Sequence, residues 1–124
     1  MTKPLALVFY ERLLPGSQLV NRLHDLDYRV ETVMDAALLP KIAFEKRPIV
    51  MVLDLVSKGV SISELIHEMK VNPATTHIPI IGFADKNQKK LHDQAVKSGA
   101  DLVAYDDALL PQLGQLLEHA LHVE

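Results

Sequence analysis

Five short apolar segments recur along the chain, each separated from the next by a stretch with the spacing of a helix. The first, third and fourth segments are apolar almost without interruption, which is typical of strands covered on both faces of a parallel sheet. The second alternates polar and apolar residues, which indicates a place at the edge of the sheet. The five segments are Leu5–Tyr10, Tyr28–Met34, Ile49–Leu55, Ile78–Ala84 and Asp101–Tyr105.

The intervening stretches repeat apolar residues every three or four positions, most clearly at Leu109, Leu113 and Leu117. Strands that alternate with single helices are joined by right-handed crossovers. The sequence therefore predicts an α/β fold, (βα)5, with a doubly wound parallel sheet. A chain of 124 residues supports one hydrophobic core of this kind, so we expect a single domain over residues 1–124.

Proline and glycine mark the expected ends of the helices. Pro15 and Pro111 suit the first helical position, where the missing N–H costs nothing. Pro40 would fall in the second turn of a helix that began near Asp35, so the second helix should be short, start late or be kinked. The third helix is expected to end at Asn72-Pro73, and the fourth, about Asn87–Lys97, at Ser98-Gly99.

Composition excludes several classes of function. Thirteen basic and sixteen acidic residues are mixed along the chain, so neither nucleic acid nor a membrane surface is expected as a partner. The absence of cysteine excludes thiol catalysis, disulfides and cysteine-based metal sites. No apolar run reaches the roughly 18 residues of a membrane span, and the first residues lack a signal sequence, so we expect a cytoplasmic protein.

Asp54 is the residue that most suggests chemistry. Sites in open parallel sheets form at the carboxyl ends of the strands, and Asp54 ends the buried run 49–53. A carboxylate there is poorly solvated, so it is either an acidic cap of a turn, an acceptor carboxylate or a metal ligand. We find no His/Asp/Glu arrangement of a metalloenzyme, no Walker motif and no serine elbow, and we expect no enzyme activity.

Several short motifs follow one another in a fixed order around Asp54. They are Leu26-Asp27-Tyr28-Arg29-Val30, Asp54 with Gly59, Glu64-Leu65, Asn72-Pro73, Ile78-Pro79-Ile80-Ile81 and Ser98-Gly99-Ala100-Asp101. In this order and spacing the whole chain resembles the CheY-like receiver domains of response regulators. The resemblance implies the flavodoxin-like strand order 2-1-3-4-5 and makes Asp54 the phosphoacceptor position.

The chain departs from the receiver pattern at most of the other functional positions. The acidic pair that binds Mg2+ with the acceptor becomes Tyr10 and Glu11, and the hydroxyl residue that ends strand four becomes Ala84. The lysine after strand five becomes Asp106, and Val103 stands at the aromatic switch position. An anion would repel a phosphoryl group where a receiver supplies a cation.

These departures predict an atypical receiver, or pseudo-receiver, that acts through protein–protein contacts without aspartyl phosphorylation and without a cofactor. One alternative is a receiver phosphorylated on Asp54 by a histidine kinase in a phosphorelay, with Mg2+ held by Glu11 and Asp54. A second alternative is a small-ligand sensor with a pocket above the strand ends.

The departures from the receiver pattern leave several acidic residues in the expected pocket around Asp54. If Glu11, Asp54 and Asp106 converge with no cation, at least one of the three carboxyl groups should have a raised pKa. Lys58 or Lys86 would otherwise supply a counter-ion. Either arrangement would hold the pocket in one state.

The resemblance also implies a contact surface on helix four, strand five and helix five. The residues expected there are Lys89, Lys90, His92, Lys97, Tyr105 and the exposed side of Gln112–His122. We expect this surface to bind a signalling protein partner or a second copy of the chain.

Overall fold

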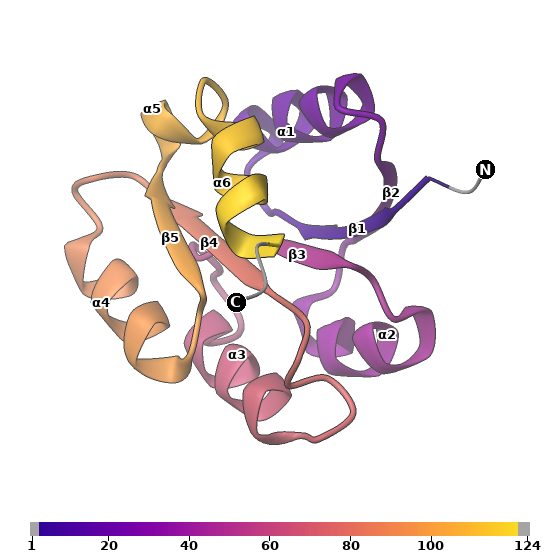
Figure 1. Ribbon diagram of the computed structural model, residues 1–124. Coiled ribbons are helices and arrows are strands. Elements are labelled where there is room, and N and C mark those ends of the chain that lie inside the picture. Colours follow the sequence, from indigo (N-terminus) through magenta and orange to yellow (C-terminus); the bar gives the residue numbers. More distant parts are fainter. Residues whose placement is uncertain (1–2, 122–124) are drawn as a thin grey trace.

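The computed structural model describes residues 3–121, which form a five-stranded parallel sheet between two layers of helices (Figure 1). The strand order β2-β1-β3-β4-β5 confirms the predicted topology. The strands lie within the five predicted segments: β1 (Leu5–Phe9), β2 (Arg29–Val33), β3 (Val50–Asp54), β4 (Ile80–Ala84) and β5 (Leu102–Tyr105). His122 lies outside the described residues. None of the described helices is long and apolar enough to cross a membrane.

The helices bury a separate core on each face of the sheet. The helices α2 (Leu39–Lys46), α3 (Ile62–Val71) and α4 (Lys89–Ser98) pack on one face, and α1 (Leu13–Asp25) and α6 (Leu113–Leu121) pack on the other. The central strands β3 and β4 are buried along their whole length. This burial on both faces explains the unbroken apolar runs of their sequences.

The proline predictions hold for the first two helices. Leu14 has extended backbone angles, so the regular turns of α1 begin at Pro15. A short 3-10 helix, η1 (Ala36–Leu38), is capped by the side chain of Asp35, and α2 begins only at Leu39. The second helix is therefore short and starts late, with Pro40 in its first turn, where no intrahelical N–H donor is lost.

The prediction for the last helix was wrong. Instead of one helix that starts at Pro111, the chain forms a single turn, α5 (Asp106–Leu109), and then α6. Pro111 lies between the two helices. Because proline has no N–H to donate to the carbonyl four residues earlier, it ends α5 rather than beginning α6.

The motif before β5 has a structural role at the amino ends of the strands. Asp101 Oδ2 accepts a hydrogen bond from the Ile80 N–H (2.8 Å) and pairs with Lys70 Nζ (2.9 Å). Gly99 ends α4 in the left-handed conformation, with φ of 112°. The contacts of Asp101 tie α3, β4 and β5 together at the end of the sheet opposite Asp54.

Candidate functional site at the carboxyl ends of the strands

Three charged side chains from three different elements meet at the carboxyl end of the sheet. Asp54 is the last residue of β3 and is completely buried. Arg12 follows β1, the neighbour of β3, and occupies the position directly before α1. Asp106 is the first residue of α5, directly after β5. The parallel strands bring these three residues together although they are far apart in the sequence.

The guanidinium of Arg12 binds both carboxylates. Its Nε and Nη2 donate to Oδ2 and Oδ1 of Asp54, at 3.0 and 2.8 Å. Its Nη1 and Nη2 donate to Oδ2 and Oδ1 of Asp106, at 2.7 and 3.3 Å. We call this cluster of Arg12, Asp54 and Asp106 the arginine clamp. Each carboxylate receives two charge-assisted hydrogen bonds, the arrangement for which the planar guanidinium is suited.

The surroundings of the clamp hold Asp54 in place. The backbone N–H of Val56 donates to its Oδ1 at 3.0 Å, and the Arg12 guanidinium lies 5.9 Å from the ring centre of Phe83. Partial burial lowers the pKa of Arg12, but hydrogen bonds and coulombic attraction from Asp54 and Asp106 outweigh it and raise the pKa above its usual value. The Arg12 side chain is therefore a permanent cation in this pocket.

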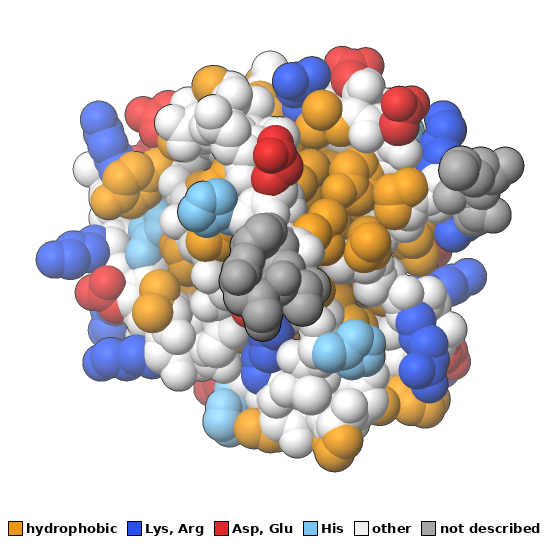
Figure 2. Space-filling view, viewed as in Figure 1, with side chains coloured by type: hydrophobic (Ala, Val, Ile, Leu, Met, Phe, Trp, Pro, Cys, Tyr) orange, Lys and Arg blue, Asp and Glu red, His pale blue; other side chains and the backbone are white. Residues whose placement is uncertain are grey.

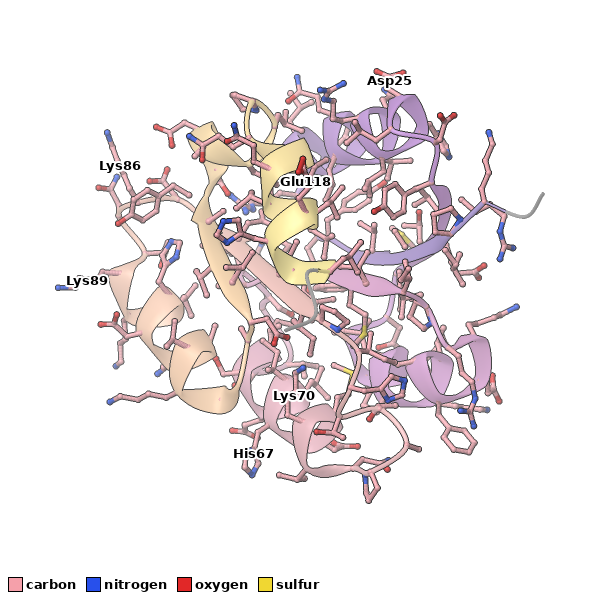
Figure 3. The ribbon with its side chains drawn as sticks, in the orientation of Figure 1. Asp25, His67, Lys70, Lys86, Lys89 and Glu118 are labelled. Carbon is pink, nitrogen blue, oxygen red and sulfur yellow. The ribbon has the colours of Figure 1, made fainter. Side chains whose placement is uncertain are left out.

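Glu11 does not join the other two carboxylates. It accepts hydrogen bonds from the Ser57 hydroxyl and from the backbone N–H of Lys58, at the side of the β3–α3 loop. The expectation that three carboxylates converge was therefore wrong, because Glu11 ties down this loop instead. The counter-ion of Asp54 and Asp106 is Arg12, and neither Lys58 nor Lys86 has that role. Figure 3 shows Lys86 pointing away from the sheet.

The remaining predicted pocket residues line the site without adding polar groups that face Asp54. The ring of Tyr10 packs directly on Gly16 of α1, where a Cβ atom would overlap it. Ala84 is completely buried, and its carbonyl oxygen lies 3.1 Å from His92 Nε2. Val103 is half-buried and packs against the core that α2, α3 and α4 cover.

His92 does not belong to the exposed contact surface that the sequence suggested. Only 8% of it is exposed, and its Nε2 lies within hydrogen-bond distance of the carbonyl oxygens of Ala84 and Asp85. Its ring also meets the ring of Tyr105 edge to face, with centres 4.9 Å apart. The face of α4 that carries His92 points to the sheet, so this histidine closes the turn after β4.

The donor set at this end of the sheet does not fit Mg2+. The ion requires near-octahedral oxygen ligands, but both oxygens of Asp54 are bound to Arg12 and the carboxylate of Glu11 is bound to the loop. Among residues 3–121, no three His, Asp or Glu side chains are grouped so that they could hold a metal. A guanidinium stands beside Asp54 instead.

A hollow beside the clamp is too small for the predicted sensor pocket. It measures about 100 Å³ and is lined by Asp85, Lys86, Asp106 and Asp107. Ligand pockets commonly measure several hundred cubic ångströms, so this hollow admits little more than a few water molecules. It does not support a small-ligand site above the strand ends.

Arg12 is the residue that the sequence analysis missed. It stands directly after the acidic-pair positions Tyr10 and Glu11. The signal that could have found it is charge balance: Asp54 ends β3, the neighbour of β1, and residues 10–14 after β1 hold one cation, Arg12. A buried carboxylate requires such a partner.

Comparisons with known proteins agree on the fold. No protein-family model matches the sequence, and no curated protein matches it. Among solved structures, a protein described as a response regulator from Chloroflexus aurantiacus superposes with a TM-score of 0.88 at 14% identity, over 97% of this chain and 98% of its own.

Two receiver domains give similar superpositions. That of a sensor histidine kinase from Pseudomonas aeruginosa, with a magnesium ion coordinated in its active-site cleft, has a TM-score of 0.87 at 15% identity, over 97% of this chain and 98% of its own. The receiver domain of NtrX from Brucella abortus has a TM-score of 0.84 at 18% identity, over 96% and 99%. The five parallel strands in the order 2-1-3-4-5, with helices between them, thus give this chain the fold of the CheY-like receiver domains of response regulators.

Proposed function

We propose that the protein is an atypical receiver-like signalling module that acts through protein–protein contacts and does not depend on phosphorylation of Asp54. In this proposal it is a cytoplasmic binding module rather than an enzyme, and it uses no Mg2+. The observation that carries the proposal is the arginine clamp.

The clamp opposes phosphoryl transfer in two ways. Both oxygens of Asp54 accept hydrogen bonds from the Arg12 cation, which stabilises the carboxylate and makes it a weaker nucleophile toward a phosphoryl group. Asp106 lies on the other side of the same guanidinium and would repel the incoming group. Receivers stabilise the transferring group with cations, and here the local cation is already neutralised by two carboxylates.

The clamp also favours a single conformation. It joins the end of β3 to the segments after β1 and β5 through a partly buried guanidinium, and separating these segments would leave Asp54 buried without a partner. Breaking a buried pair costs about 3–5 kcal/mol. A domain held in one state in this way suits constitutive binding to a partner better than a switch.

The proposed contact surface consists of exposed side chains of α4, β5 and the helices that follow. Lys89, Lys90 and Lys97 are exposed on α4, and Tyr105 is half-exposed at the end of β5. Figure 3 shows Lys89 extending away from the body of the domain. Exposed lysines on α4, next to the strand that ends in the half-exposed ring of Tyr105, favour an acidic protein surface, on a signalling partner or on a second copy of the chain.

The first test measures phosphorylation directly. The full chain is incubated with acetyl phosphate and Mg2+, or with beryllofluoride and Mg2+, and followed by mass spectrometry and by NMR. We expect neither a mass increase nor a shift of amide signals around Asp54. A stable adduct that disappears in Asp54→Asn would overturn the proposal.

The second test addresses the contact surface. Partners captured from a bacterial lysate by the wild-type chain should be lost with the variant Lys89→Glu/Lys97→Glu. The matched control is Arg22→Glu/Lys41→Glu, which changes two exposed cations of α1 and α2 by the same charge. Equal loss with both variants would show that only net charge matters and would remove the support for this face.

A second candidate, the phosphorylated receiver, has one observation in its favour. Asp54 ends β3, as the resemblance to receivers requires, and Arg12 could pair with a phosphoryl group if it exchanged Asp54 for the new anion. This candidate predicts that acetyl phosphate modifies the wild-type chain and that Arg12→Ala abolishes the modification. Our proposal predicts no modification of the wild-type chain.

A further inference from the structure

A hollow lined by several basic side chains lies at the opposite end of the sheet from the clamp. This hollow, which we call the basal hollow, measures about 580 Å³ and opens at the amino ends of β1, β3 and β4. Its size is within the usual range for small-molecule sites. We propose that the basal hollow binds a small amphiphilic anion: an apolar body that carries a carboxylate or phosphate group.

The rim of the hollow is basic. It comprises Lys3, Arg29, Lys46, Arg47 and His77, and no Asp or Glu among the described residues lines it. These side chains come from four separate parts of the chain: the amino ends of β1 and β2, the end of α2 and the turn before β4. A chain whose net charge is -3 has thus gathered basic groups at one place, which favours an anionic ligand.

The floor of the hollow is apolar and rigid. Pro4, Pro48 and Pro79 each stand just before a strand, and Leu5 and Ile49 lie beside them. Ile49 is 44% exposed, a large value for an isoleucine adjoining a central strand. Figure 2 shows one face of the molecule, on which hydrophobic side chains gather in patches and Lys and Arg side chains lie mostly at the margin. An apolar surface inside a basic rim suits a ligand that has both an apolar body and an anionic group.

The backbone conformation of Arg47 is a second, independent observation that favours an anion site. It follows α2 in the left-handed conformation, with φ of 48°, where glycine or asparagine is strongly preferred. A residue with a Cβ atom is disfavoured there because that atom crowds a carbonyl oxygen. Arg47 lines the hollow, and its guanidinium lies 5.6 Å from the ring centre of Phe44, which does not line it. The position carries a cation at a conformational cost, which is consistent with a role in binding.

The strained backbone at Arg47 also allows a substitution that removes the cation without destabilising the fold. Arg47→Gly removes the cation and relieves the strain, so the folded chain should be at least as stable as the wild type. Loss of binding in this variant could not be blamed on unfolding. Lys41→Gln is the matched control, because Lys41 is an exposed cation of the same helix that does not line the hollow.

The probes are decanoate and decyl phosphate, with 1-decanol and decyltrimethylammonium as the neutral and cationic analogues. The full chain is titrated below the micelle concentration of each probe, and amide NMR signals are followed. We expect saturable shifts at Leu5, Arg29, Ile49 and His77 with the anions only. Comparison of the decanoate and decyl phosphate titrations shows which head group binds more tightly.

Because a charge-assisted hydrogen bond contributes strongly to affinity, Arg47→Gly should weaken binding of the anions about tenfold or more. Lys41→Gln should change their affinity less than twofold. Equal binding of 1-decanol, or an unchanged affinity in Arg47→Gly, would overturn the proposal. Shifts centred on the apolar groove of Leu26, Tyr28 and Leu117 would do the same. So would binding that appears only in a chain ending at Leu121, since the chain's own last residues would then be the occupant.

Discussion

The guanidinium of Arg12 meets the carboxylate of Asp54 side-on, with Nε 3.0 Å from Oδ2 and Nη2 2.8 Å from Oδ1. Asp54 is completely buried, whereas 29% of the Arg12 side chain is exposed. The buried partner of such a pair depends on the exposed one, because the cost of burying a carboxylate is offset only while the cation is present.

Truncation of Arg12 should therefore destabilise the fold more than truncation of any exposed arginine. Breaking a fully buried pair costs about 3–5 kcal/mol, and because water can reach the space left by a partly exposed side chain, we expect Arg12→Ala to lose about 2–3 kcal/mol of the free energy of unfolding. Urea denaturation followed by circular dichroism measures this loss.

The control for this prediction is Arg22→Ala, an exposed arginine of the same helix, which should change stability by less than about 0.5 kcal/mol. The double variant Arg12→Ala/Asp54→Asn should recover part of the loss, because the buried group is then neutral. Equal losses for Arg12→Ala and Arg22→Ala would show that the clamp contributes nothing to stability.

Receiver chemistry should return only when the clamp is removed together with the other departures. The variant Tyr10→Asp/Ala84→Thr/Asp106→Lys places receiver-type residues at three positions but leaves Arg12 beside Asp54. We expect it to show no beryllofluoride-dependent NMR shift with Mg2+. Addition of Arg12→Ala to these three substitutions should produce a saturable shift around Asp54.

These two variants separate the effect of Arg12 from that of the missing residues. If the variant that keeps Arg12 binds beryllofluoride as well as the one that lacks it, the guanidinium is no obstacle. The clamp would then be a structural pair alone. Thermal unfolding of both variants before the titration checks that each is folded.

The topology could be predicted from the sequence because it depends on repeated local patterns. Continuous apolar runs identify the central strands, and the alternating sequence of β2 agrees with its place at the edge of the sheet. The break at Pro111 was missed, since proline can begin one helix or end another and local sequence does not separate the two cases. The residue before Pro111, Leu110, does not show whether a helix ends or begins there either.

The site could be predicted only as a set of positions. Asp54 and Asp106 were expected at the same edge of the sheet, because parallel strands place their carboxyl ends together. The direction of a long side chain depends on tertiary contacts, so Glu11 turning to Ser57 and Arg12 turning to Asp54 were both unforeseen. The resemblance to receivers implies a contact surface that includes His92, but this residue is buried on the face of α4 that packs on the sheet.

Two glycines in helices should respond in opposite ways to substitution by alanine. A Cβ at Gly114 of α6 would meet no atom within 4 Å, so Gly114→Ala should stabilise the fold by about 0.4–1 kcal/mol through the lower entropy of the unfolded chain. A Cβ at Gly16 of α1 would overlap the ring of Tyr10, so Gly16→Ala should cost about 1–3 kcal/mol.

The measurement is the midpoint and slope of urea unfolding for both variants. The variant Gly16→Ala/Tyr10→Ala is the control, since removal of the ring makes room for the new methyl group. It should be no less stable than Tyr10→Ala alone. A neutral effect of Gly16→Ala in the wild-type background would contradict the close packing of Tyr10 against α1.

The stability of the fold should fall at high pH through ionisation of Tyr28. Burial raises the pKa of this phenol above its usual value of about 10. The folded state therefore keeps its proton at a pH where the unfolded state has begun to lose it. The resulting stabilisation is complete below the pKa of the unfolded state and is lost as pH rises through that of the folded state.

Urea unfolding at about pH 9 and about pH 11 tests this dependence, because the two values lie on either side of the ordinary phenol pKa. The wild-type chain should lose more stability between them than Tyr28→Phe, which cannot ionise. Tyr105→Phe is the matched control, since it removes the same hydroxyl group from a half-exposed residue at the end of β5. An identical loss in the wild type and in Tyr28→Phe would mean that other groups, chiefly lysines, account for alkaline unfolding.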